Sequence, residues 1–233
     1  MTTVVLVRHG LTHMTGPVLA GWTPDLHLDE RGQAQAQAVA ERLRPVPFDA
    51  VVSSPLDRCL DTAAAILAGR DGLTLEVERR LGECRYGDWT GRPIKELVKD
   101  PLWKVVQNHP SAVVFPGPEG EALAHTQARA VEAVRAGNAR FGPDATWLAC
   151  SHGDVIKAIV ADAMGLHLDQ FQRIVIDPCS VTVIRYTETR PFVVRVNDTG
   201  GGVADLLPPK KKGRRRKASS DATPGGGAGD GSV

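Results

Sequence analysis

The stretch VVLVRHGLTH, residues 4–13, joins a short apolar run to a guanidinium and an imidazole. Residues 4–7 are apolar and mostly β-branched, which is typical of a fully buried strand in a parallel sheet. Arg8 and His9 follow at once, and burying a charge without a partner costs several kcal/mol. Packing therefore does not explain these two side chains. We expect a central strand that carries Arg8 and His9 into a site.

Strand-like and helix-like patterns alternate along the rest of the chain. Strands are expected at residues 49–53, 73–77, 146–150, 180–186 and 192–197, and helices at 29–44, 54–67, 119–140 and 151–164. Asp29 and Ser54 are the expected N-caps of the first two helices, and Ser151 heads an expected capping box. The pattern predicts the α/β class, as a three-layer sandwich with a mostly parallel central sheet flanked by helices.

Composition divides the chain into a domain with a substantial apolar content, residues 1–199, and a tail, residues 200–233. The tail is rich in Gly, Ser, Pro and charge and buries too little apolar surface to offset its ordering entropy, so we expect disorder. Residues 208–233 carry a net charge of +5 and the remainder −4, which together give the +1 of the whole. Clustered Lys and Arg could make weak contacts with nucleic acid or an anionic surface, and the alternative is a solvated end.

Cysteine spacing and hydropathy bear on the compartment. The four cysteines lie far apart without a CxxC pair, which is typical of reduced thiols. No apolar run reaches the roughly 18 residues of a spanning helix, and the first residues show no signal-peptide pattern. We expect a cytoplasmic protein without a transmembrane segment.

Three expected strand ends carry polar side chains suited to an anion. Arg8-His9 ends the first strand, Arg58 lies in the helix after the second, and His152 follows the strand at 146–150. Ligands of open α/β sheets bind at the carboxyl ends of the strands, where helix N-termini favour anions. The arginine fork also matches phosphate oxygens in geometry and charge. If these strands are parallel neighbours, the sequence predicts a phosphate site.

Four blocks follow one another along the chain: LVRHG, SSPLDRCLDTA, LGECRYGDWTG and CSHGDVIKAI. In this order they resemble the blocks of the histidine phosphatase superfamily, in its phosphoglycerate-mutase-like branch. The resemblance covers roughly residues 4–196. Within the superfamily, the chain is similar to a group of actinobacterial proteins labelled phosphomutases.

The resemblance implies a role for each block. His9 corresponds to the nucleophile that becomes a phosphohistidine, and Glu83 to the carboxyl that protonates the leaving oxygen. Arg8, Arg58 and a protonated His152 correspond to the groups that hold the phosphoryl oxygens. These groups can compensate the charge of a transferring phosphoryl without a metal, and no cofactor is expected. The other histidines form no HxxxH pair of metal ligands.

Further residues bear on the choice of substrate, either as candidate contacts or as differences from the usual superfamily sequence. Candidate substrate-binding residues are Thr15, Gly21, Glu121 and Gly153. Leu11 stands where the superfamily usually has Glu or Gln, and Thr15 stands where it has Asn. A substrate preference taken from typical members is therefore not transferred to this chain.

Three functions are compatible with these residues. The favoured one is a metal-independent phosphomonoesterase acting on a small phosphorylated metabolite through a phosphohistidine. The first alternative is a phosphoglycerate-type phosphomutase, disfavoured because residues 91–117 lack the paired arginines of true mutases. The second is a catalytically quiet binding module recruited through its basic tail. The sequence names no substrate, and the chain could form a homo-oligomer.

Overall fold

The strand that ends at Arg8 lies inside the sheet, with strands on both sides. A computed structural model of the chain describes residues 1–201 and 221–229. Its six-stranded sheet has the order β3-β2-β4-β1-β5-β6. The strands are β1 (Thr2–Arg8), β2 (Ala50–Ser53), β3 (Leu75–Val77), β4 (Thr146–Ser151), β5 (Val181–Tyr186) and β6 (Pro191–Asp198). Strands β1 to β4 run parallel, and β5 and β6 add an antiparallel edge.

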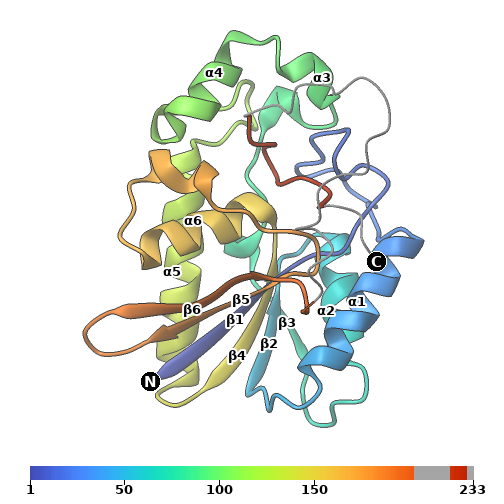
Figure 1. Cartoon of the computed structure of the whole chain (residues 1–233), viewed down its shortest axis with the longest axis vertical. Helices are drawn as coiled ribbons and strands as arrows, with labels where there is room; N and C mark the ends of the chain where they lie inside the picture. Colours follow the sequence, from blue (N-terminus) through green and yellow to red (C-terminus); the bar gives the residue numbers. More distant parts are fainter. Residues whose placement is uncertain (202–220, 230–233) are drawn as a thin grey trace.

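Helices cover both faces of this sheet (Figure 1). One face packs against α1 (Glu30–Leu43) and α2 (Asp57–Leu67), and the other against α5 (Leu123–Phe141) and α6 (Gly153–Ala163). Helix α1 illustrates the sequence logic, because the Asp29 carboxylate accepts from Gly32 N at 2.9 Å and caps it. The predicted α/β sandwich is confirmed.

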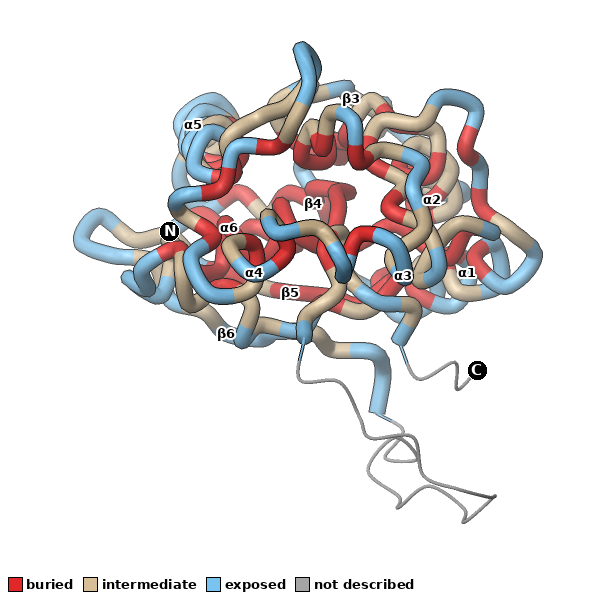
Figure 2. Tube along the Cα trace, turned by 90° about the horizontal axis from the view of Figure 1, so that it is seen from above, coloured by how far each residue is buried: buried red, intermediate tan, exposed pale blue. Residues whose placement is uncertain are grey.

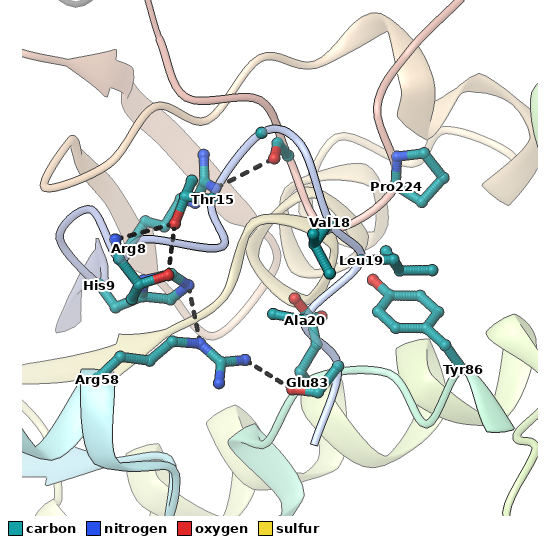
Figure 3. A pocket seen from close by; sticks show the side chains of 15 residues that line it. Arg8, His9, Thr15, Val18, Leu19, Ala20, Arg58, Glu83, Tyr86 and Pro224 are labelled. Carbon is teal, nitrogen blue, oxygen red and sulfur yellow. Dashed lines mark hydrogen bonds between the residues drawn. The ribbon is translucent and has the colours of Figure 1, made fainter. Parts of the chain in front are cut away.

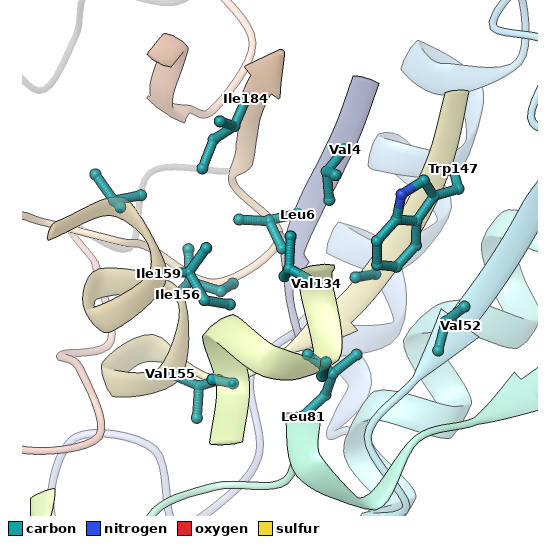
Figure 4. Close-up of a cluster of buried hydrophobic side chains, with 14 of the residues drawn as sticks. Val4, Leu6, Val52, Leu81, Val134, Trp147, Val155, Ile156, Ile159 and Ile184 are labelled. Carbon is teal, nitrogen blue, oxygen red and sulfur yellow. The ribbon is translucent and has the colours of Figure 1, made fainter. Parts of the chain in front are cut away.

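Two apolar clusters hold the helices to the sheet. The cluster under α5 and α6 includes Leu6, Trp147, Ile156 and Ile159, which interdigitate in Figure 4. Viewed from above, the buried residues gather along the central strands and the exposed ones lie outside (Figure 2). Strand β1 supplies alternate residues to the two clusters, as expected for a strand buried on both faces.

The chain between β3 and α5 builds a cap over the carboxyl ends of the strands (Figure 1). It contains the short helices η1 (Arg79–Leu81), η2 (Gly87–Trp89), α3 (Ile94–Leu97), α4 (Pro101–Asn108) and η3 (Pro110–Ala112); η4 (Leu168–Arg173) follows α6. A third apolar cluster, containing Tyr86, Trp89, Trp103 and Phe115, fixes this cap. This cap therefore lies over the strand ends at which the sequence predicts a phosphate site.

Three predicted helix starts are wrong. Helix α2 begins at Asp57 with Leu56 as its N-cap, because the Ser54 hydroxyl binds His152 and accepts from Leu56 N at 3.3 Å in the turn before the helix. Helix α6 begins at Gly153 without a side-chain cap, since Ser151 Oγ donates to Leu81 O at 2.7 Å. Helix α5 begins at Leu123, because residues 119–122 form isolated β-bridges with the cap.

The tail differs in part from the expected disorder. Residues 221–229 pack against the domain, where Pro224 is buried. Low apolar content predicts disorder, but this segment is held by hydrogen bonds between its backbone and the buried side chains of Arg8 and Asp154. The basic run at 210–217, on which nucleic-acid contact was predicted, lies outside the described residues, and homo-oligomer formation stays a prediction. Within the described chain, no helix is long and apolar enough to cross a membrane.

Candidate active site

Three neighbouring parallel strands bring the predicted residues to one edge of the sheet. In the β1–β4 ladder Arg8 is paired with Ser151, and in the β2–β4 ladder Ser53 is paired with Cys150. The residues that follow these strand ends therefore lie side by side. The rings of His9 and His152 have centroids 5.2 Å apart, and Arg58 lies between the two histidines.

His9 is held as a neutral ring whose Nε2 carries no hydrogen. Its Nδ1 lies 2.7 Å from Gly10 O, which can only accept, so Nδ1 carries the hydrogen. Its Nε2 accepts from Arg58 Nε at 3.2 Å. Burial, with the charges of Arg58 and Arg8, lowers the pKa of His9 well below its usual value. Nε2 is therefore unprotonated and available as a nucleophile.

The loop of His9 is locked to the start of α1 by a contact between backbones. A Cβ at Gly10 would lie 2.6 Å from Gly32 O, and a Cβ at Gly32 would collide with Leu11 O. Asp29 N also donates to Leu11 O at 3.0 Å. Only glycine at both positions allows this approach, which fixes the residues that follow the nucleophile.

Two buried guanidinium groups make the site positive. Arg8 and Arg58 are each 1% exposed, and within residues 1–201 and 221–229 neither forms an ion pair with a carboxylate. Arg8 Nε and Arg58 Nη1 are buried without a hydrogen-bond partner in the same residues. Buried charges are costly unless paired, and orphaned donors need a ligand. Together they form a receptor for an anion such as phosphate.

His152 is neutral in this arrangement, contrary to the expected protonated form. Its Nδ1 lies 3.2 Å from Arg58 Nη2, a donor, so Nδ1 accepts and Nε2 donates to Ser54 Oγ at 2.7 Å. Burial, then the Arg58 charge, lowers the pKa of His152 well below its usual value. The sequence could not anticipate this state, because it does not show that Arg58 donates to the ring.

Glu83 supplies an ionisable carboxyl beside these groups. It is 2% exposed, its Oε1 accepts from Cys84 N at 2.9 Å, and its Oε2 lies 4.0 Å from His152 Nδ1. Burial, followed by the charge of Asp154, raises the pKa of Glu83 to about 7. A carboxyl with this pKa holds a proton in a substantial fraction of molecules at neutral pH and can donate it.

Glu121 lies behind the pocket and does not line it, which corrects its predicted substrate contact. Its carboxylate holds Arg129 at 2.6 Å and 2.9 Å. Arg129 in turn donates to the carbonyls of Arg80, Gly82 and Glu83. A buried bidentate pair of this kind orders the segment that carries Glu83. Glu121 is therefore a positioning residue.

Of the other three candidate contacts, Thr15 and Gly21 line the pocket and Gly153 does not. Thr15 lines it, and Thr15 Oγ1 accepts from Thr12 N at 3.0 Å, so the hydroxyl ties the loop together. Gly21 lines it with a carbonyl that accepts from Arg58 Nη2 at 2.8 Å. Gly153 opens α6, and its Cα faces the carbonyl of Gly225.

Sequence reasoning missed Tyr86, which lines the pocket, and Asp154, which binds the Tyr86 hydroxyl. Tyr86 OH donates to Asp154 Oδ2 at 2.9 Å, and Lys157 Nζ lies 3.3 Å from Asp154 Oδ1. Asp154 was interpreted only as part of a helix cap. The available signal was Lys157, three residues later and flanked by apolar residues at 155–156 and 158–161, which indicates a buried partner for the carboxylate.

Figure 3 shows the resulting pocket, with Arg8, His9 and Arg58 on one side and Tyr86 and Pro224 on the other. The cavity left among these side chains has a volume of about 30 Å³, close to the share of one water molecule in the liquid. Within the described ranges, no three or more His, Cys, Asp and Glu side chains group as metal ligands.

Comparison of the sequence with known protein families identifies the family of this chain. The model of the histidine phosphatase superfamily (branch 1) matches residues 4–199. The chain belongs to the histidine phosphatase superfamily. The resemblance drawn from the four blocks is thereby confirmed, while the narrower similarity to actinobacterial phosphomutases stays a prediction.

Relatives within the superfamily carry two kinds of name. Phosphoserine phosphatase 1 of Hydrogenobacter thermophilus is 28% identical, over 85% of this chain and 93% of its own length. A Yersinia pestis protein named "Probable phosphoglycerate mutase GpmB" is 30% identical, over 81% and 87%. The solved structure of a mycobacterial glucosyl-3-phosphoglycerate phosphatase aligns with a TM-score of 0.74 at 27% identity, covering 84% of this chain and 98% of that one. Superfamily and relatives are thus phosphatases or mutases.

Proposed function

We propose that this histidine phosphatase superfamily member hydrolyses monoesters of phosphate, carried by small metabolites, through a phosphohistidine on His9. One observation carries the proposal. His9 Nε2 keeps an unprotonated lone pair beside two buried guanidinium groups, and a carboxyl with a pKa of about 7 lies next to the same pocket. Nucleophile, anion receptor and proton donor are the three groups that phosphoryl transfer to an imidazole requires.

In the first step His9 Nε2 attacks phosphorus, and the bond between phosphorus and the ester oxygen breaks. The proton of Glu83 passes to the leaving oxygen, which departs as the alcohol. The guanidinium groups of Arg8 and Arg58 compensate the charge on the phosphoryl oxygens, and each has a buried nitrogen without a partner among the described residues. The arriving dianion also favours the protonated form of His152, since an opposite charge nearby raises the pKa of a histidine.

In the second step water attacks the phosphohistidine. Glu83, now ionised, takes the proton of the attacking water, and the bond between phosphorus and Nε2 breaks. Inorganic phosphate leaves and both side chains return to their starting forms. Thr15 and Gly21 border the space into which the ester extends.

The test compares His9→Ala with His125→Ala, a control on an exposed helical position. We expect turnover of p-nitrophenyl phosphate to vanish in His9→Ala and to stay at the wild-type rate in the control. Acid-labile phosphate should be trapped on His9 in the wild-type protein by mass spectrometry. Full turnover in His9→Ala would reject the mechanism, and absence of turnover in the wild-type protein would favour the binding module.

The mutase is retained as a second candidate because of the relative named as a phosphoglycerate mutase. A mutase must return the phosphoryl group to an isomeric acceptor instead of to water. Incubation with 3-phosphoglycerate and a bisphosphate primer separates the two activities. Release of inorganic phosphate without isomerisation supports the phosphatase, and isomerisation with little release supports the mutase.

A further inference from the structure

Residues 221–229, here called the C-terminal segment, lie over the active site between α4 and the strand ends (Figure 1). We infer that the pocket has a second ligand, this glycine-rich segment of the chain itself, which competes with phosphate esters for Arg8. The inference rests on the proposed function for what the segment competes with. The contacts of the segment stand independently of it.

The first part of the segment is bound by the cap. Trp103 Nε1 donates to Asp221 Oδ2 at 3.0 Å. The Gln107 side chain forms two hydrogen bonds with the backbone of Ala222, because Nε2 donates to Ala222 O and Oε1 accepts from Ala222 N, both at 2.8 Å. This two-way pairing fixes the register of the segment, because the donor and the acceptor of one side-chain amide bind the C=O and the N–H of the same residue. Helix α4 thus supplies a defined docking point.

The middle of the segment is bound by charged groups of the pocket. Gly225 N donates to Asp154 Oδ2 at 2.8 Å. Arg8 Nη1 donates to Gly227 O at 2.7 Å and Arg8 Nη2 to Gly226 O at 3.2 Å. Hydrogen bonds to charged groups are stronger than those between neutral groups, and these are partly or largely removed from water. A carboxylate and a guanidinium that face the pocket therefore both bind backbone of the segment.

The segment and a phosphate ester compete because both bind the Arg8 guanidinium. The proposed mechanism assigns the Arg8 guanidinium to phosphoryl oxygens, and two of its nitrogens donate to the carbonyls of Gly226 and Gly227. Pro224, Gly225 and Gly226 also line the cavity and leave only about 30 Å³ open. A phosphate ester and the segment cannot occupy this space together. Because the segment offers neutral carbonyls, a phosphate dianion at sufficient concentration displaces it.

The segment requires glycine at position 226 but has room for a side chain at position 227. Gly226 has a φ of +82°, and a Cβ there would lie 2.8 Å from Arg8 Nη1. A Cβ at Gly227 would meet nothing within 4 Å, and its φ lies outside the left-handed range. An alanine at Gly226 is therefore strained and pushed against Arg8, whereas one at Gly227 is accommodated. The chain itself offers a matched pair of variants.

The experiment compares Gly226→Ala and Gly227→Ala in the full-length chain. If the segment occupies the pocket in about nine molecules of ten, its release lowers apparent dissociation constants roughly tenfold. We expect the KM for p-nitrophenyl phosphate to fall by that factor in Gly226→Ala with kcat unchanged. The dissociation constant of inorganic phosphate, measured by calorimetry, should fall equally. Gly227→Ala should match the wild-type protein in both.

Amide hydrogen exchange gives a readout that does not need turnover. Exchange of residues 221–229 should be slow in the wild-type protein, fast in Gly226→Ala, and accelerated in the wild-type protein by inorganic phosphate. Equal phosphate affinity in the wild-type protein and Gly226→Ala would overturn the inference. Weaker affinity in the variant would also do so, because the segment would then complete the phosphate site.

These outcomes separate the two proposals. Tighter phosphate binding in Gly226→Ala, in a protein that hydrolyses no ester, would reject the phosphatase and keep the segment as a competing ligand. Turnover with identical constants in all three proteins would keep the phosphatase and reject the competition.

Discussion

Arg58 Nε lies 3.2 Å from His9 Nε2, so the cation that faces the phosphate pocket also touches the nucleophilic nitrogen. Burial lowers the pKa of His9 most, and this contact adds to it, because a neighbouring positive charge disfavours a second one. It also aims the ring, since the guanidinium fork has a fixed geometry. One side chain therefore contributes to the charge state of the nucleophile and sets its orientation.

Substitution Arg58→Lys should lower kcat for p-nitrophenyl phosphate by roughly a hundredfold. A lysine keeps the charge but cannot donate to His9, Gly21 and His152 through one planar group, as Arg58 does. Arg31→Lys, on the exposed start of α1, is the control and should keep the wild-type rate. A kcat in Arg58→Lys within twofold of the wild-type value would show that charge alone suffices.

The pH dependence of kcat/KM should be bell-shaped, with its alkaline limb near pH 7. Activity requires a protonated Glu83, whose pKa is raised to about 7, and a neutral His9, whose pKa is lowered well below 6.5. Raising the pH through 7 removes the proton of Glu83, and only strongly acidic solution protonates His9. The maximum therefore lies on the acid side of neutrality.

Profiles of Glu83→Gln and Glu132→Gln check this assignment. Glutamine at position 83 should abolish the limb near pH 7 together with most of the activity. The exposed Glu132 should leave the profile unchanged on substitution. A wild-type rate that still increases between pH 7 and 9 is incompatible with Glu83 as the proton donor.

The same carboxyl should make stability fall with rising pH. Burial raises the pKa of Glu83 in the folded chain to about 7 from its ordinary value of 4.5, so the unfolded chain releases this proton first as the pH rises. Folding is disfavoured progressively between pH 4.5 and 7, by about 3 kcal/mol in total. Glu83→Gln should therefore gain about 3 kcal/mol relative to the wild-type protein between pH 4 and pH 8 in urea unfolding. A pH-independent difference would contradict the raised pKa.

Removing the cation of the buried pair should destabilise the fold. Lys157 is 4% exposed and lies 3.3 Å from Asp154, so Lys157→Met leaves a buried carboxylate without its cation. We expect a loss of about 3 kcal/mol in unfolding free energy. Arg135→Met, which breaks an exposed pair with Asp162, should cost less than about 1 kcal/mol. Equal losses in the two variants would show that burial of the pair contributes nothing.

The arrangement of the strands could be predicted from the sequence because it depends on local patterns. Short apolar runs followed by Arg8-His9 or His152 mark central parallel strands and their carboxyl ends at the same time. Parallel pairing of β1, β4 and β2 then brings these ends together without further information.

What could not be predicted depends on partners that are distant in the chain. Ser54 and Ser151 match capping patterns, yet their hydroxyls bind His152 and the Leu81 carbonyl. Glu121 looks like a pocket residue until its ion pair with Arg129 is known. The neutral state of His152 and the docking of residues 221–229 likewise depend on contacts with Arg58 and Arg8, which no local pattern encodes.

The contact of Gly10 and Gly32 also has a genetic consequence. A methyl group at either glycine meets backbone atoms of the facing segment, and backbone atoms are the same whichever side chains surround them. No second substitution can therefore restore room for Gly32→Ala in the way that a smaller neighbour rescues an overpacked core. A screen for second-site suppressors of Gly32→Ala should return reversions to glycine alone.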